Sequence, residues 1–203
     1  CLANVFEYGT SLLLSLGQRV GTRARIECFT EIGFAGKAGD KKLRPDGLIV
    51  LTVGSRRWTA LVEAKVGNNE LTNEQIEAYL SLAQMHKIDA VISISNQFSA
   101  SPQHHPLQFK SRLTNKVNLY HWSWMYLLTE ADLLLSNSQI EDADQHYILR
   151  ELVRFLTHPS AGVKGFDAMP KAWSDMVNSV RAGAPIRANS PEAEEVVGAW
   201  HQE

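Results

Sequence analysis

Two short apolar runs on either side of a tight turn constrain the fold of this chain more than any other feature of its sequence. Residues 48–53 (LIVLTV) and 58–62 (WTALV) are rich in β-forming residues, and Gly54 and Ser55 stand between them. Glycine at the first position of a two-residue loop is typical of a type II′ hairpin turn. The pattern therefore predicts two antiparallel strands in which paired residues have numbers that add to 109.

Charged residues gather at the open end of this predicted hairpin. The register places Asp46 directly opposite Glu63, and because side chains alternate along a strand, Lys65 shares a face with Glu63 while Ala64 points away. Two neighbouring carboxylates repel each other, and a divalent cation relieves that repulsion. Asp46, Glu63 and the backbone carbonyl of Ala64 are therefore candidate Mg²⁺ ligands. Lys65 is a candidate to orient or deprotonate an attacking water, or to neutralise charge on a phosphate.

A competing interpretation treats the same residues as ordinary surface features. Asp46 would be a turn residue before Gly47, and Glu63 and Lys65 would form a solvated ion pair at the end of a strand. However, apart from Thr59 the run 58–62 is apolar on both faces, as expected of a central strand. Charges that begin abruptly at its end favour the functional interpretation.

The rest of the chain predicts an α/β fold with a mixed central sheet flanked by helices. The expected elements are a helix over 2–17, a strand over 25–32, the hairpin, a helix over 73–87, strands over 90–95 and 117–122, and helices over 123–135 and 141–157. After Pro159 the pattern changes to loops, a short helix over 171–181 and an acidic end. We therefore expect one domain over 1–158 and a C-terminal helical extension with a linker over 159–203.

The sequence Pro45-Asp46-Gly47, followed by a hairpin and then Glu63-Ala64-Lys65, resembles the PD-(D/E)XK nuclease superfamily. The resemblance covers residues 2–125 and implies a restriction-endonuclease-like core of the order αβββαβ. It also implies that Asp46 and Glu63 bind Mg²⁺, with Mn²⁺ as a substitute, and that Lys65 assists the nucleophilic water. The implied activity is hydrolysis of phosphodiester bonds in DNA by a metal-dependent endonuclease or exonuclease.

Three further residues are candidates for this site. Gln75 and Tyr79 match the Gln-x-x-x-Tyr element of the RecB-like branch of the superfamily, and residues four apart share one helix face. The competing interpretation is that Gln75 belongs to a capping box with Thr72, while Tyr79 packs in the core. Many members also carry an acidic residue on the first core helix, where this chain has Glu7; its alternative is an ordinary exposed glutamate.

Charge and aromatic residues indicate where nucleic acid would bind. The net charge of −2 divides into +4 over residues 1–65 and −6 over residues 66–203, and a basic half can hold a phosphate backbone. The basic residues that lead into Asp46 are candidates for phosphate contacts: Lys37, Lys41, Lys42 and Arg44. Aromatic residues after the last strand are candidates for base stacking, with core packing as the alternative: Trp122, Trp124 and Tyr126. The adjacent His104 and His105 are expected to be exposed to solvent.

Composition sets the expected setting and partners. Two cysteines suit a reducing cytosol, and no apolar run reaches the length of a membrane helix, so we expect a cytoplasmic protein without membrane association. The expected partner is DNA, with RNA as the alternative. The absence of an initiator Met suggests a fragment with a missing N-terminal domain or partner subunit, and double-strand cutters of this fold often act as homodimers. The alternative to a nuclease is a non-catalytic nuclease-fold module that binds nucleic acid or a partner protein.

Overall fold

The computed structural model describes residues 1–34, 43–67, 69–99, 101–109, 112–163 and 171–187, together with residues 190, 192–193 and 196–197. The elements follow in the order α1 (Phe6–Ser15), β1 (Arg25–Thr30), β2 (Gly47–Val53), β3 (Arg56–Ala64), α2 (Asn73–Met85), β4 (Ala90–Ser95), the 3-10 helix η1 (Arg112–Asn115), β5 (Asn118–Ser123), α3 (Trp124–Ser136), α4 (Ala143–Thr157), the 3-10 helix η2 (Pro159–Ala161) and α5 (Lys171–Arg181). No helix within the described residues combines the length and the apolar character that a membrane span requires.

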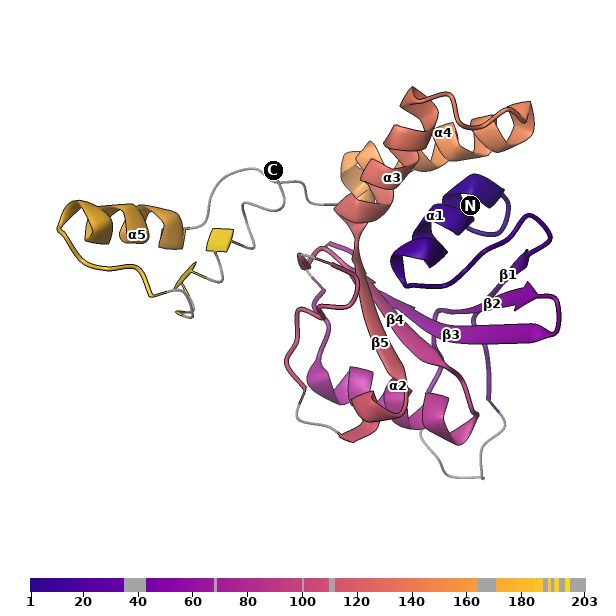
Figure 1. The fold of residues 1–203 in the computed structure, drawn as a ribbon, viewed down its shortest axis with the longest axis horizontal. Coiled ribbons are helices and arrows are strands. Elements are labelled where there is room, and N and C mark those ends of the chain that lie inside the picture. The colour runs from indigo at the N-terminus through magenta and orange to yellow at the C-terminus, as the bar shows by residue number, and fades with distance from the viewer. Residues whose placement is uncertain are drawn as a thin grey trace.

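The described strands form one five-stranded mixed sheet in the order β1-β2-β3-β4-β5. The pairs β1–β2 and β2–β3 are antiparallel, whereas β3–β4 and β4–β5 are parallel. Helix α2 covers one face of the sheet, and α1, α3 and α4 lie on the other side (Figure 1). The predicted α/β class with a mixed, helix-flanked sheet is therefore confirmed.

The predicted register of the central hairpin is also confirmed. Gly47 pairs with Val62 and Val53 pairs with Arg56, so that paired numbers add to 109. Gly54 has a φ of +60°, whereas Ser55 is not among the residues with positive φ, as a type II′ turn requires. The chain therefore makes the turn with glycine at the position where a side chain would be strained.

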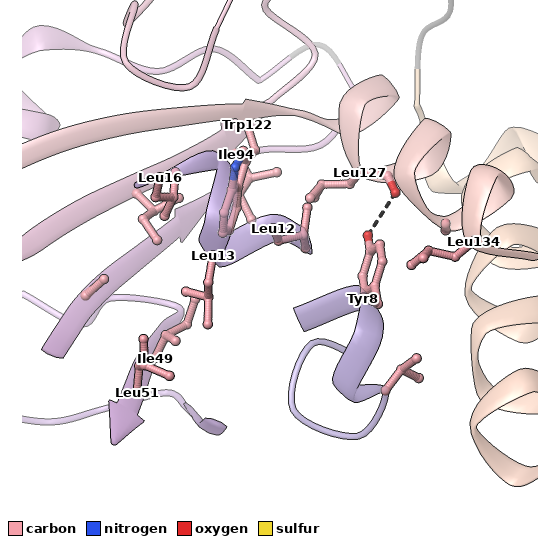
Figure 2. Close-up of a cluster of buried hydrophobic side chains, with 14 of the residues drawn as sticks. Tyr8, Leu12, Leu13, Leu16, Ile49, Leu51, Ile94, Trp122, Leu127 and Leu134 are labelled. Atoms are coloured by element: carbon pink, nitrogen blue, oxygen red, sulfur yellow. Dashed lines mark hydrogen bonds between the residues drawn. The ribbon is translucent and has the colours of Figure 1, made fainter. Parts of the chain in front are cut away.

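Alternation along the strands divides the core into two layers. Even-numbered residues of β3, such as Trp58 and Ala60, join the larger layer beneath α1, α3 and α4. The odd-numbered Leu61 joins the smaller layer beneath α2. Figure 2 shows the larger layer, in which the hydroxyl of Tyr8 on α1 donates a hydrogen bond of 2.8 Å to the carbonyl of Leu127 on α3. Side chains at the end of β3 therefore point to α2 if their number is odd.

The segment that follows β3 is held by residues from far along the chain. Asn96 Nδ2 lies 2.9 Å from the carbonyl oxygen of Gly67 and 2.7 Å from that of Gly162 and donates to both. Gly162 has a φ of +66°, and a Cβ there would lie 3.0 Å from the backbone of Gly67. Only glycine suits this contact, because any side chain would be both strained and crowded.

Most expected helices and strands agree with the described elements within a few residues. The first helix is shorter than expected, because α1 begins at Phe6 rather than at residue 2. The expected helix over 171–181 is α5, which Figure 1 shows apart from the other helices. Most of the acidic end and the loop that carries Lys37, Lys41 and Lys42 lie outside the described residues.

Candidate active site

Asp46 and Glu63 lie opposite each other at the end of the central hairpin. Asp46 directly precedes β2, Glu63 is the second-to-last residue of β3, and the next pair, Gly47 with Val62, continues the ladder. The backbone N–H of Ala64 donates to Asp46 Oδ2 at 2.8 Å. Asp46 is exposed, whereas Glu63 is only 3% exposed. The hairpin therefore holds a carboxylate accessible to solvent beside a buried one.

The two carboxylate oxygens of Glu63 have different surroundings. Oε1 accepts hydrogen bonds from Lys65 Nζ at 2.7 Å and from Gln75 Nε2 at 2.6 Å. Oε2 is buried and has no hydrogen-bond partner among the residues that the structure describes. Leaving a buried charged oxygen without a donor is costly, roughly 1–3 kcal/mol or more. The described residues therefore orient this carboxylate through one oxygen only.

Helix α2 supplies Gln75 and Tyr79, and both interpretations of this helix hold in part. The Thr72 side chain caps α2 by accepting from the backbone N–H of Gln75 at 3.3 Å. The Gln75 side chain, however, reaches Glu63 rather than returning to the cap. Tyr79 is buried in the smaller core layer, and its hydroxyl donates to the carbonyl of Arg44 at 3.4 Å. Burial, and then the neighbouring carboxylate of Glu63, raise the pKa of Tyr79, so its hydroxyl remains protonated.

Glu7 is not brought to this group. It is half-buried on α1, on the opposite side of the sheet from α2, and its Oε2 has no hydrogen-bond partner within the described ranges. Among the described residues, no three His, Cys, Asp or Glu side chains lie together so that they could hold a metal ion. Of the predicted site residues, the structure therefore joins Asp46, Glu63, Lys65, Gln75 and Tyr79 through direct or shared contacts and leaves Glu7 outside.

The donor atoms that are present fit a hard cation with few protein ligands. Mg²⁺ is commonly held by only one or two carboxylates, with waters and substrate phosphate completing the shell. Asp46 supplies an accessible carboxylate, and Glu63 supplies a buried oxygen that no described residue contacts by a hydrogen bond. In an extended residue the N–H and C=O point to the same side, so the Ala64 carbonyl lies on the side where its N–H meets Asp46. These three residues are therefore the ones that would bind the ion.

Of the four basic residues that precede Asp46, only Arg44 is described. Its side chain is 61% exposed and forms an ion pair with Glu31 at 2.5 Å. An exposed pair of this kind contributes little to stability, and a phosphate could displace Glu31 at small cost. Arg44 therefore remains a candidate for a phosphate contact.

Of the three aromatic residues considered for base stacking, Trp122 follows the alternative of core packing. Its side chain is 1% exposed and lies within the core shown in Figure 2, so no base can reach it. Its indole N–H donates to Ser15 Oγ at 3.3 Å. Trp124 and Tyr126, by contrast, are half-buried at the start of α3.

A chain of buried polar groups beside Glu63 was not foreseen. Ser93 pairs in register with Glu63 on one side and with His121 on the other, so the three form a row across β3, β4 and β5. The Ser93 hydroxyl lies 2.8 Å from His121 Nδ1 and 2.8 Å from His105 Nε2. Glu63, Ser93 and His121 are aligned because β3, β4 and β5 pair in parallel. The sequences of the separate strands do not specify that pairing.

Backbone groups at both ends define the direction of these hydrogen bonds. His121 Nε2 lies 2.8 Å from the carbonyl of Gln97, so this nitrogen carries the proton, and Ser93 donates to Nδ1. At the other end, the Leu107 N–H donates to His105 Nδ1 at 3.1 Å, so His105 donates to Ser93 through Nε2. Burial lowers the pKa of both histidines to about 4. The expected exposure thus applies to His104 but not to His105, which is half-buried.

Comparison with known proteins adds no assignment. The chain matches no protein-family model, no curated protein and no solved structure.

Proposed function

We propose that this chain is a metal-dependent nuclease that hydrolyses phosphodiester bonds of DNA, with a restriction-endonuclease-like core. The observation that carries the proposal is the divided environment of Glu63. One oxygen is held by Lys65 and Gln75, and the other is buried without a donor in the described part of the chain, opposite the accessible Asp46 in the hairpin register. Glu7 Oε2 is likewise without a partner among the described residues, but only at Glu63 does the hairpin register place a second carboxylate, that of Asp46, opposite.

In this proposal Asp46, Glu63 and the Ala64 carbonyl hold Mg²⁺, with Mn²⁺ as a substitute. The ion supplies a Lewis acid that activates water and offsets negative charge on the phosphate. During hydrolysis the water oxygen forms a bond to phosphorus while the bond from phosphorus to the leaving sugar oxygen breaks. The products are a phosphate monoester and a free hydroxyl.

Lys65 acts beside this reaction as a cation. Its Nζ donates to Glu63 Oε1 at 2.7 Å, so its remaining protons are available to orient a water or a phosphate oxygen. A fixed cation that faces developing negative charge stabilises the transition state more than the ground state. Gln75 donates to the same Glu63 oxygen and so orients the carboxylate, while Tyr79, one turn further along α2, donates to the carbonyl of Arg44.

A cleavage assay tests the proposal. The substrates are supercoiled plasmid, linear duplex DNA, single-stranded DNA and single-stranded RNA, each with Mg²⁺, Mn²⁺ or EDTA. Cleavage should require metal and should be lost in Asp46→Asn and Glu63→Gln. Glu151→Gln is the matched control, because Glu151 also forms an ion pair, with Arg154, but on the exposed face of α4.

The outcomes separate the proposal from its alternatives. No cleavage of any substrate together with no Mn²⁺ binding in calorimetry would refute it. Binding of Mn²⁺ or of nucleic acid without cleavage would instead favour the non-catalytic nuclease-fold module. Cleavage of RNA alone would keep the chemistry and change the substrate.

A further inference from the structure

The backbone of Lys65 is held from two directions, although Lys65 lies just beyond the end of β3. Its N–H donates to the carbonyl of Ile94 on β4 at 2.8 Å. Its carbonyl accepts from the indole Nε1 of Trp124 at 2.7 Å, a contact between residues 59 positions apart. Residues that follow a strand commonly lose such partners, so this double attachment is a specific feature of this position.

The hydrogen bond from Trp124 has no function in its own helix. Trp124 is the first residue of α3, and the helix is capped by Ser123, whose side chain accepts from the backbone N–H of Tyr126 at 3.0 Å. The Trp124 ring packs against the larger core layer, which fixes the ring in place. The indole N–H is therefore a rigid donor from the core to the backbone of Lys65.

The position of this backbone determines where the ammonium group of Lys65 can act. A lysine side chain has four rotatable bonds, so its Nζ is directed only if the main chain and the terminal contact are both fixed. Glu63 Oε1 provides the terminal contact, and Ile94 with Trp124 fixes the main chain. Without the indole bond, the main chain at Lys65 would lose one of the two hydrogen bonds that fix it.

We propose that Trp124 is a positioning residue that directs Lys65 toward the reacting phosphate. The catalytic consequence depends on the proposed nuclease function, whereas the effect on the geometry of Lys65 does not. Trp124 acts through the main chain of Lys65 and through no contact with substrate.

The test compares two substitutions of the same kind. Trp124→Phe keeps a ring and removes the indole donor to Lys65. Trp122→Phe is the matched control, since it removes an indole donor from the end of β5 that points instead to Ser15 Oγ. We expect Trp124→Phe to lower kcat about five- to tenfold, the effect of one lost hydrogen bond, with KM and the Mg²⁺ half-saturation within about twofold. Trp122→Phe should leave kcat within about twofold.

Combination with Lys65→Ala shows whether Trp124 acts through Lys65. In a Lys65→Ala background, Trp124→Phe should cause no further decrease in rate. An equal decrease in both backgrounds would overturn the proposal. A rise in KM at unchanged kcat would also overturn it, because Trp124 would then contact substrate directly.

A measurement independent of activity separates this inference from the nuclease proposal. In the NMR spectrum of ¹⁵N-labelled lysine side chains, the ammonium signal of Lys65 is identified by its absence in Lys65→Arg. Trp124→Phe should shift or broaden this signal, and Trp122→Phe should leave it unchanged. An unchanged signal in Trp124→Phe would refute the positioning role even if the protein cleaves DNA, and a changed signal would support it even if the protein does not.

Discussion

The substitution Glu63→Gln distinguishes a metal site from a structural ion pair. The change keeps the shape of the side chain and the acceptor oxygen for Gln75 but removes the negative charge. If Glu63 and Lys65 formed an ordinary buried ion pair, breaking it would cost about 3–5 kcal/mol of unfolding free energy. The Lys65 side chain, however, is 24% exposed, so its ammonium group can be solvated after the ion pair is broken. Glu63 Oε2 accepts no hydrogen bond from the described residues that the substitution could remove. In EDTA we therefore expect Glu63→Gln to change the unfolding free energy by no more than about 1 kcal/mol.

Metal should stabilise the parent protein and not this variant. At a Mg²⁺ concentration ten times the dissociation constant, one site adds about 1.4 kcal/mol, or about 3–5 °C in Tm for a chain of this size. The assay is thermal and urea unfolding in EDTA and in Mg²⁺, with Glu151→Gln as the control that keeps the metal shift. A loss of 3 kcal/mol or more in EDTA would refute the reasoning, because Glu63 would then be a structural group. A full metal shift in Glu63→Gln would show that the ion binds elsewhere.

Three further predictions follow from the same geometry. Lys65→Ala should lower the single-turnover cleavage rate by about 10²–10³-fold while Mn²⁺ affinity in calorimetry stays within about twofold, because the metal ligands remain. Gln75→Ala should lower cleavage about tenfold and shift Tm by less than about 2 °C, because the Thr72 cap uses only the backbone of residue 75. The buried histidines are harder to protonate in the folded state, so stability should fall as pH decreases from about 6.5 to about 4, with a slope approaching about two protons.

Each of these predictions has a control and a result that contradicts it. Lys87→Ala removes an exposed lysine at the other end of α2, and cleavage should be unaffected; equal losses in both lysine variants would contradict the assignment to Lys65. A large drop in Tm for Gln75→Ala would mean that its side chain serves the fold. For the pH slope, urea unfolding of His121→Gln should reduce the proton uptake to about one, and an unchanged slope would place the titrating groups elsewhere.

The hairpin and its polar end could be predicted because the relevant interactions are local. A two-residue turn with glycine first defines the register, and the register determines which side chains share a face. Asp46, Glu63 and Lys65 are therefore placed by sequence numbers alone. The same reasoning gave the class of fold, because the order of helices and strands limits how a sheet can be covered.

Other parts of the site depend on contacts between distant segments. The row of Glu63, Ser93 and His121 follows from the parallel pairing of three strands that are separated by a helix and a long loop. No turn defines that register. The burial of Trp122 likewise depends on α1 packing across the sheet, and the alternation of aromatic residues after β5 gave no indication of which one faces inward. Gln75 shows that one residue can satisfy two patterns, since its backbone completes the cap and its side chain reaches Glu63.

The contact between Gly67 and Gly162 bears on how much of the chain must be retained when the domain is shortened or transplanted. A piece cut after residue 157 would contain all the proposed site residues. Asn96, however, would lose its acceptor at Gly162, and Gly67, two residues after Lys65, would lose its contact with Gly162. We therefore expect a shortened domain to need residues through η2 to residue 162, well past the 2–125 core suggested by the motif. In a library of shortened or recombined variants, junctions placed after this turn would preserve the geometry, and junctions placed before it would leave the end of β3 without support.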